Sequence, residues 1–299
     1  MNILGEIAGL ATSFFFALNA VVLTSVGKMV GSQVTNRFRL VFALVYLIAI
    51  NLILFNEPLP FSADSSHWVW LSISGVIGFA LGDAFLFKSY VMIGPRLGSL
   101  MMSLAPIFGS LIAWVIFGET LSPLQILGMS LALAGIVWVV TSHKEAADTP
   151  RRHTRTGVIF GVLAGLGQAM GLVLSKQGMA NHFHPFQANA IRLLAATVFI
   201  ILWMLIERKA GATVQVIREN PASIGLLALG ALIGPVLGVS ASLLAVQLTE
   251  VGVASTLTSL APVLLLPISY FALKEKISWQ GVAGTILAIA GVAVLFLAK

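Results

Sequence analysis

The sequence predicts an all-α polytopic membrane protein whose ten transmembrane helices form two inverted five-helix repeats. Of its 299 residues, 58% are hydrophobic and only 9% are charged, and the mean hydropathy is +1.00. A soluble domain carries roughly 25% charged residues, so a water-soluble enzyme is excluded. The lack of cysteine also excludes a disulfide-stabilised scaffold. The other two observations behind the prediction are long apolar runs and a repeated pattern of glycine, proline and polar residues.

Ten apolar runs are long enough to cross a bilayer as helices, since a span needs about 20 residues to cover a core of roughly 30 Å. They lack the alternation of the roughly ten-residue strands of a membrane barrel. We expect the first run to be a retained helix, because its first basic residue, Lys28, follows the apolar stretch instead of preceding it. The expected spans are 3–24, 38–56, 68–92, 97–117, 121–141, 157–177, 186–207, 223–246, 252–273 and 278–297.

One long polar stretch, residues 142–156, divides these spans five and five. It predicts a linker between a first domain, 1–141, and a second, 157–299. If the connections alternate sides, 14 of the 17 basic residues fall on the side of this linker and 3 on the other. Lys and Arg collect in short cytoplasmic loops, so the linker is expected in the cytoplasm and both termini outside it. The net charge of +6 therefore indicates orientation and not nucleic-acid binding.

The second half repeats the first. A shift of 156 residues superimposes 71–140 on 227–296 without a gap, and the first two helices align more loosely at a shift near 152. Because five is an odd number, the two copies enter the membrane from opposite sides. Inverted repeats are typical of secondary transporters, whose substrate sites lie near the midplane between the halves. The aligned residues include Gly78 with Gly234, Gly82 with Gly238, Ser103–Pro106 with Ser259–Pro262, and Glu119 with Glu275.

The stretches 94–139 and 252–296 resemble the EamA family of the drug/metabolite transporter superfamily. The most specific parts are the apolar run ending in proline, the GE or KE before the last helix of each half, and the AG near the end of each half. The resemblance implies a ten-helix carrier of the bacterial inner membrane, expected to export amino acids or other small polar metabolites. It implies a small-molecule substrate and the lipid bilayer as partners, in a monomer or homodimer, with no cofactor or metal.

Asp83 is the one acid deep inside an expected span. A charge at the centre of a bilayer costs on the order of 3 kcal/mol, and such residues usually face the protein interior or a proton path. Tyr90 lies seven residues further, on the same helical face. Two roles stay open for Asp83, namely a carboxyl group that couples H+ to transport, and a structural ion pair with Lys88 or Arg39.

Other candidate site residues carry two interpretations each. Arg192 either binds a substrate carboxylate or extends to the membrane interface. Pro106 and Pro262 lie about ten residues inside equivalent expected helices, where a proline breaks the backbone ladder. They are expected to act as kinks and hinges, although prolines are frequent in membrane helices. The remaining candidates either line a cavity or bond neighbouring helices; they are Asn19, Gln168, Ser240 and Gln247.

These features predict a secondary active transporter that works by alternating access. A membrane-embedded enzyme would need converging ionisable groups, and the sequence offers one intramembrane acid without a buried histidine or a metal cluster. A channel-like facilitator stays open as an alternative, because repeats alone do not exclude it. The sequence has no P-loop, so we expect coupling to ion or substrate gradients rather than to ATP.

Overall fold

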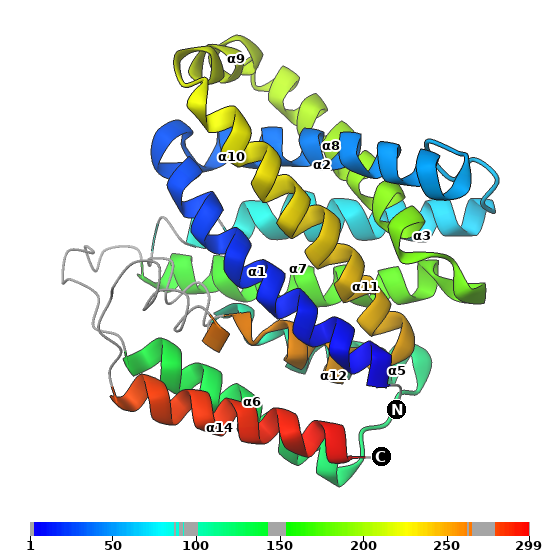
Figure 1. Cartoon of the computed structure of the whole chain (residues 1–299), viewed down its shortest axis with the longest axis vertical. Coiled ribbons are helices and arrows are strands. Elements are labelled where there is room, and N and C mark those ends of the chain that lie inside the picture. The colour runs from blue at the N-terminus through cyan, green and yellow to red at the C-terminus, as the bar shows by residue number, and fades with distance from the viewer. Residues whose placement is uncertain are drawn as a thin grey trace.

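The computed structural model of the chain describes residues 3–86, 88, 89, 92, 101–142, 154–261, 263, 264 and 279–298. These residues form a bundle of helices (Figure 1). Seven helices in this part of the chain are long and apolar enough to cross a membrane. They are Ile3–Gly27, Gln33–Phe55, Ser65–Leu86, Arg155–Gly178, Pro185–Ile206, Ala222–Leu248 and Trp279–Leu297. Two shorter apolar helices, Ala105–Phe117 and Pro123–Trp138, accompany them. The prediction of an all-helical polytopic membrane protein is confirmed.

The first half begins with two long helices and continues into a helix that changes its winding. Local signals set the helix ends: Gly31 (φ 79°) separates the first two helices, and Gly118 (φ 67°) follows α5. Ser122 and Gln125 bond each other's backbone N–H groups and start α6 as a capping box. The elements are α1 (Ile3–Val30), α2 (Ser32–Phe55), α3 (Ser65–Gly75), η1 (Val76–Gly82), α5 (Ala105–Phe117) and α6 (Pro123–Ser142).

The second half repeats this order and adds one helix. Helix α9 occupies the stretch between the seventh and eighth expected spans, where the sequence predicts only a connection, and it lies at the upper end of the molecule in Figure 1. The elements are α7 (Thr154–Gly178), η3 (Ala180–His182), α8 (Pro185–Ile206), α9 (Ala210–Glu219), α10 (Ala222–Ala231), η4 (Leu232–Gly238), α11 (Val239–Leu248), α12 (Val251–Thr258) and α14 (Trp279–Leu297).

The two π-helical segments, η1 and η4, lie at positions that correspond at the shift of 156 residues. A π-helix is a rare widened turn that is found frequently at functional sites. Each segment packs through its glycines against the first helix of the opposite half. A Cβ atom on Gly171 of α7 would stand 3.2 Å from Cα of Gly78 in η1, and a Cβ atom on Gly234 of η4 would overlap Asn19 of α1. Both π segments therefore lie at the contact between the two halves.

Equivalent helices of the two halves run antiparallel to each other. Helices α6 and α14 lie side by side in Figure 1. Gly128 of α6 faces Gly291, whereas Gly135, two turns later, faces Gly284, two turns earlier in α14. Helices α2 and α8 are also antiparallel, because the end of α2 at Phe55 packs on His184 while its beginning meets the end of α8.

The fourth expected span, 97–117, is interrupted by a break, instead of a kink, in the part that the structure describes. The helical ladder stops at Met102, Ser103 and Leu104 form a turn, and α5 begins at Ala105. Pro106 thus occupies the first turn of a helix, where its missing N–H needs no partner. The expectation that Pro106 lies inside a continuous helix is wrong on this point. A turn at the equivalent Ser259 and Leu260 ends α12, and Pro262 lies outside the described residues.

The largest buried cluster lies between α2, the α3–η1 helix, α8 and the α10–η4–α11 helix. It includes the fully buried Leu40, Leu47, Leu71, Ile191 and Leu243. The outer faces of the bundle carry exposed Val, Ile, Leu and Trp side chains, as expected for helices in contact with lipid. The N- and C-termini lie at the same end of the molecule (Figure 1).

Candidate functional site

A buried ion pair lies where η1 ends. Asp83 is 6% exposed and caps this π-helical segment. Its carboxylate Oδ2 accepts a hydrogen bond from Nη2 of Arg39 in α2, and the same nitrogen donates to Oδ1 of Asn36 at 2.7 Å. Of the roles considered for Asp83, the structure therefore contains the ion pair, with Arg39 as the partner. Lys88 instead places its ammonium 5.1 Å from the ring centroid of Phe160.

A second arginine, which is buried, lies beside this pair. Arg192 in α8 is only 2% exposed, so its side chain does not extend to the membrane interface. Its guanidinium carbon lies 4.8 Å from the ring centroid of Phe79 in η1. The absence of a side chain at Gly78 leaves room for Nη2, which is 3.3 Å from where a Cβ would stand. Nε and Nη1 of Arg192 are buried and have no hydrogen-bond partner among the residues that the structure describes.

The cluster of Arg39, Asp83 and Arg192 carries one carboxylate for two guanidinium groups. Asp83 interacts electrostatically with both arginines, although it forms a direct ion pair with Arg39 alone. Taking a charge out of water carries a penalty of several kcal/mol per ion, which a close partner must offset. The three charges therefore leave a net positive charge inside the helix bundle.

The two arginines belong to a repeated Asn-X-X-Arg pattern, Asn36 to Arg39 and Asn189 to Arg192. The two asparagines bond differently. Asn189 donates from Nδ2 to the carbonyl oxygen of Pro235 at 2.7 Å and to Oγ of Ser240 at 3.0 Å, both in the second half. This pattern is the sequence signal that could have identified Asn36, Asn189 and Arg39 as site residues, because polar residues recur there on equivalent helices.

The other candidates are dispersed. Asn19, 7% exposed, packs against Gly234 of η4, and the backbone of Gln168 runs beside Gly82 of η1. Ser240 bonds Asn189, as described above. Gln247 donates to the carbonyl oxygen of Phe183 at 2.9 Å and so holds the connection between α7 and α8. Tyr90 lies outside the described residues.

Comparison with known proteins identifies the family. A model of the EamA-like transporter family matches residues 3–141 and 155–297. The chain belongs to the EamA-like transporter family. A protein of Haemophilus influenzae named only as an uncharacterized transporter is 28% identical over 180 residues, which span 58% of this chain and 58% of that protein. One solved crystal structure shares the fold with a TM-score of 0.76 at 20% identity, covering 99% of this chain and 96% of that one.

A second polar cluster in this EamA-like transporter joins α5, α7 and the start of α12. Nζ of Lys176, in the last turn of α7, lies 2.6 Å from Oε1 of Glu119 and donates to the carbonyl oxygen of Thr249 at 2.7 Å. The other carboxylate oxygen of Glu119 accepts from the backbone N–H of Val251 at 2.9 Å. Glu119 thus caps the start of α12, where the helix dipole favours an anion.

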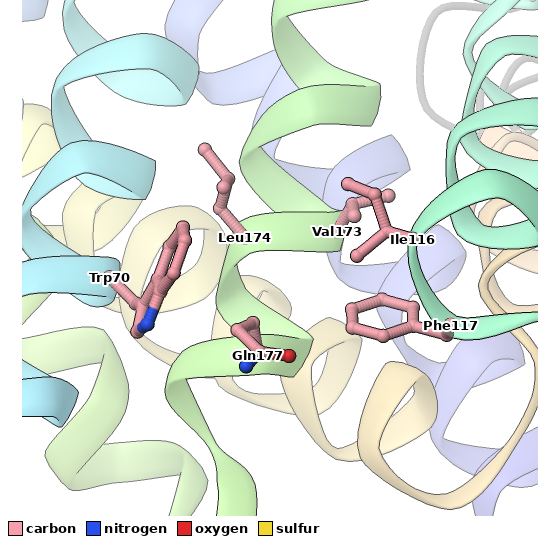
Figure 2. Close-up of a pocket in the computed structure, with 6 residues that line it drawn as sticks. All are labelled: Trp70, Ile116, Phe117, Val173, Leu174 and Gln177. Carbon is pink, nitrogen blue, oxygen red and sulfur yellow. The ribbon is translucent and has the colours of Figure 1, made fainter.

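The EamA-like bundle also contains a cavity of about 240 Å³ between α3, α5 and α7 (Figure 2). Its side chains are almost entirely apolar, and Figure 2 shows Gln177 at one edge of it. None of the three charged residues of the cluster lines it, so it is poorly suited to a polar metabolite. The lining residues are Trp70, Ile116, Phe117, Val173, Leu174 and Gln177. Within the described residues, no three His, Cys, Asp or Glu side chains converge to hold a metal ion.

Proposed function

We propose that this EamA-like transporter is a secondary carrier that moves small polar metabolites by alternating access. In this proposal the chain spans the membrane ten times, as two inverted five-helix repeats, and the domains are 1–141 and 157–299. The observation that carries the proposal is the pair of π segments at equivalent positions, each crossed by the first helix of the opposite half. Two similar units that cross in this way can exchange conformations and open the site first to one side and then to the other.

The charged cluster marks the proposed binding region. It lies between η1 and the second helix of each half, so a substrate bound there contacts elements from both repeats. Irregular backbone at membrane depth is tolerated where it is buried in protein or lines a cavity. The π segments and the breaks before α5 and after α12 fit that condition, and Pro106 and Pro262 are proposed hinges beside these breaks.

The Arg39–Asp83 and Lys176–Glu119 ion pairs are candidates for the contacts that open in turn. The Arg39–Asp83 pair joins α2 to the end of η1, and the Lys176–Glu119 pair joins α7 to the end of α5. A carrier needs states that differ by only a few kcal/mol, and exchanging one set of ion pairs for another is compatible with such a gap. Asn19 and Gln168 lie beside the π segments, and we propose that they line the route between the two ion pairs.

The proposed carrier is an exporter in a bacterial inner membrane, with residues 142–156 in the cytoplasm and both termini outside. The basic residues around α9, which include Arg208, Lys209 and Arg218, support this orientation because they collect at one end. A reporter fused to the C-terminus and active only outside the cytoplasm should be active, whereas a reporter active only in the cytoplasm should be silent. The reverse pattern would contradict the orientation.

Purified protein in proteoliposomes tests the carrier mechanism itself. Vesicles loaded with an unlabelled amino acid should take up the labelled form by counterflow that saturates and is stimulated from the opposite side. A channel-like facilitator would give uptake without trans-stimulation, and a membrane-embedded enzyme would convert the labelled compound chemically. H+ coupling through Asp83 is a separate part of the proposal, which a pH gradient across the same vesicles tests.

A further inference from the structure

We propose that Arg192 is the anchor for a carboxylate group of the substrate, so that the transported metabolites are carboxylates such as amino or other organic acids. This inference rests on the proposed carrier function and names its substrate class. It starts from the guanidinium itself, which is 2% exposed with two nitrogens that lack a hydrogen-bond partner in the described part of the chain. An unpaired buried donor that is charged carries a larger desolvation penalty than a neutral donor, and an anionic ligand would remove that penalty.

The comparison of the two arginines indicates that the missing partner comes from outside the protein. Arg39 donates from Nη2 to Asp83 and Asn36 of its own half, and among the described residues only its Nε is buried without a partner. The second half lacks both partners for Arg192. The position equivalent to Asp83 is Val239, a buried apolar residue, and Asn189 directs its amide to Pro235 and Ser240. The sequence thus keeps the second arginine but not the acid that would neutralise it.

The charge of the cluster points to the same ligand class. Two guanidinium groups and one carboxylate leave one positive charge, and the carboxylate group of a bound substrate supplies the negative charge that offsets it. The remaining neighbours of Arg192 suit an anion better than a cation, because the face of Phe79 is already covered by the guanidinium and the glycine at 78 adds no side chain. A planar guanidinium also matches carboxylate geometry better than an ammonium would.

Pairs of ligands that differ only in the carboxylate test the inference on wild-type protein. Purified full-length chain is melted in detergent with L-alanine, L-leucine and L-glutamate, each beside its α-carboxamide, and with glucose and uridine as neutral probes. At least one free acid should raise the melting temperature, and its carboxamide should bind at least ~30-fold more weakly, the factor that corresponds to about 2 kcal/mol for a buried charge pair that loses one partner. Equal stabilisation by acid and amide overturns the inference.

Substitutions at position 192 assign the effect to this side chain. Arg192→Gln should lose at least the same ~30-fold in affinity for the free acid, and Arg192→Lys should retain part of it, because it keeps the charge without the planar fork. Arg37→Gln is the matched control, since Arg37 pairs with Glu207 at the other end of α8, and it should bind like wild type. If Arg192→Gln does not fold, Val239→Asp places a carboxylate at the equivalent position and should weaken acid binding instead. Unchanged affinity in the folded variants overturns the inference.

Counterflow on the same preparations separates this inference from the carrier proposal. Saturable exchange of glucose or uridine, with no effect of any acid, supports the carrier and overturns the carboxylate anchor. Binding of an acid that depends on Arg192 without any exchange supports the anchor and overturns the carrier. If no probe binds or exchanges, both fail.

Discussion

Two arginines, the partly buried Arg39 and the buried Arg192, occupy equivalent places in the second helices of the two halves, yet their surroundings differ. Arg39 in α2 has Asp83 and Asn36 as hydrogen-bond partners. Arg192 in α8 stacks on Phe79 with two nitrogens unpaired among the described residues. One half has therefore kept a self-sufficient ion pair, and the other has kept a cation whose partner is not part of that half. The repeat places an arginine on the second helix of each half, and differences at a few surrounding positions give the two arginines different partners.

The π segments give the opposite lesson. Segment η4 contains Pro235, whereas η1 has Phe79 at the equivalent position, and both are π-helical over the same seven residues. The widened turn is therefore not a consequence of proline. The common features are the glycines at 78 and 82 and at 234 and 238, which allow another helix to approach closely. Here the two halves keep the same geometry through different side chains.

Removing the shared carboxylate should have the largest effect. Asp83→Ala leaves the partly buried Arg39 and the buried Arg192 without an acid, and breaking a buried pair in this way destabilises by about 3–5 kcal/mol. We expect a large loss of melting temperature in detergent. Glu207→Gln, which removes a carboxylate from the partly exposed pair with Arg37, is the control and should melt like wild type. An Asp83→Ala protein as stable as the control would show that the cluster does not depend on this ion pair.

Asp83→Asn sharpens the comparison, because the amide keeps the shape and an acceptor oxygen for Arg39 but cannot exchange a proton. If Asp83 couples H+ to transport, this variant should retain substrate exchange and lose accumulation driven by a pH gradient. If Asp83 serves only the ion pair, its stability should fall towards that of Asp83→Ala. Exchange, gradient-driven uptake and melting temperature are measured on one preparation. Gradient-driven uptake equal to wild type would reject the coupling role.

The contact between α3 and α8 predicts the next largest effect. A Cβ atom on Gly75 would overlap the backbone carbonyl of Arg192, whereas the equivalent position in the second half already carries a methyl group, at Ala231. Gly75→Ala should destabilise by about 1–3 kcal/mol through overpacking and shift Arg192 relative to η1. Ala231→Gly should cost only about 1 kcal/mol, mainly through helix propensity. Similar melting temperatures for the two variants would mean that the helices separate freely at this contact.

Much of this architecture could be predicted from the sequence, because long apolar runs, basic loops and repeated glycines each have one dominant physical cause. The family and the transporter class followed from the same residues. Helix α9 was missed because its ten residues are too few for a membrane span. The break before α5 was placed inside a helix, since a proline in an apolar run gives no indication of whether the helix bends or restarts.

The site could be predicted only in part. Asp83 and Arg192 stood out because a charge inside a span is rare, and the structure brings them into one cluster with Arg39. Which arginine pairs with Asp83 depends on how α2, η1 and α8 cross, and spacing along the chain does not contain that geometry. Gln247 was a cavity candidate by its helical face, but it bonds the carbonyl oxygen of Phe183 in a connection that the periodicity of its own helix does not reveal.

Pro235→Ala tests the statement that the π segments do not depend on proline. Since η1 forms its widened turn with Phe79 in that place, η4 should keep its geometry, and the change in stability should stay below about 1 kcal/mol, the range of ordinary substitutions that create no strain. The backbone carbonyl oxygen of residue 235 can still accept the hydrogen bond from Asn189 in the variant. Melting temperature and amide exchange of residues 232–238 check this expectation. Faster exchange confined to η4 would mean that the proline stabilises the turn after all.

The smallest expected effect concerns the start of the two arginine-bearing helices. His184 caps α8 by accepting the N–H of Phe186 at Nδ1, whereas α2 starts after Gly31, which has no side chain to titrate. Burial against Phe55 and Phe186 lowers the pKa of His184 below its usual range. The unfolded chain then binds a proton at His184 more readily than the folded protein does. The contribution of His184 to stability is therefore complete above the ordinary histidine pKa of about 6.5 and is lost as the pH falls through the lower, folded value.

His184→Asn keeps a capping acceptor that does not titrate, and it should remove this part of the acid sensitivity. The melting temperature is measured from about pH 7.5 to about pH 5, a range that brackets this pKa. It should fall more for wild type than for the variant. Identical pH profiles would contradict a titrating cap at α8.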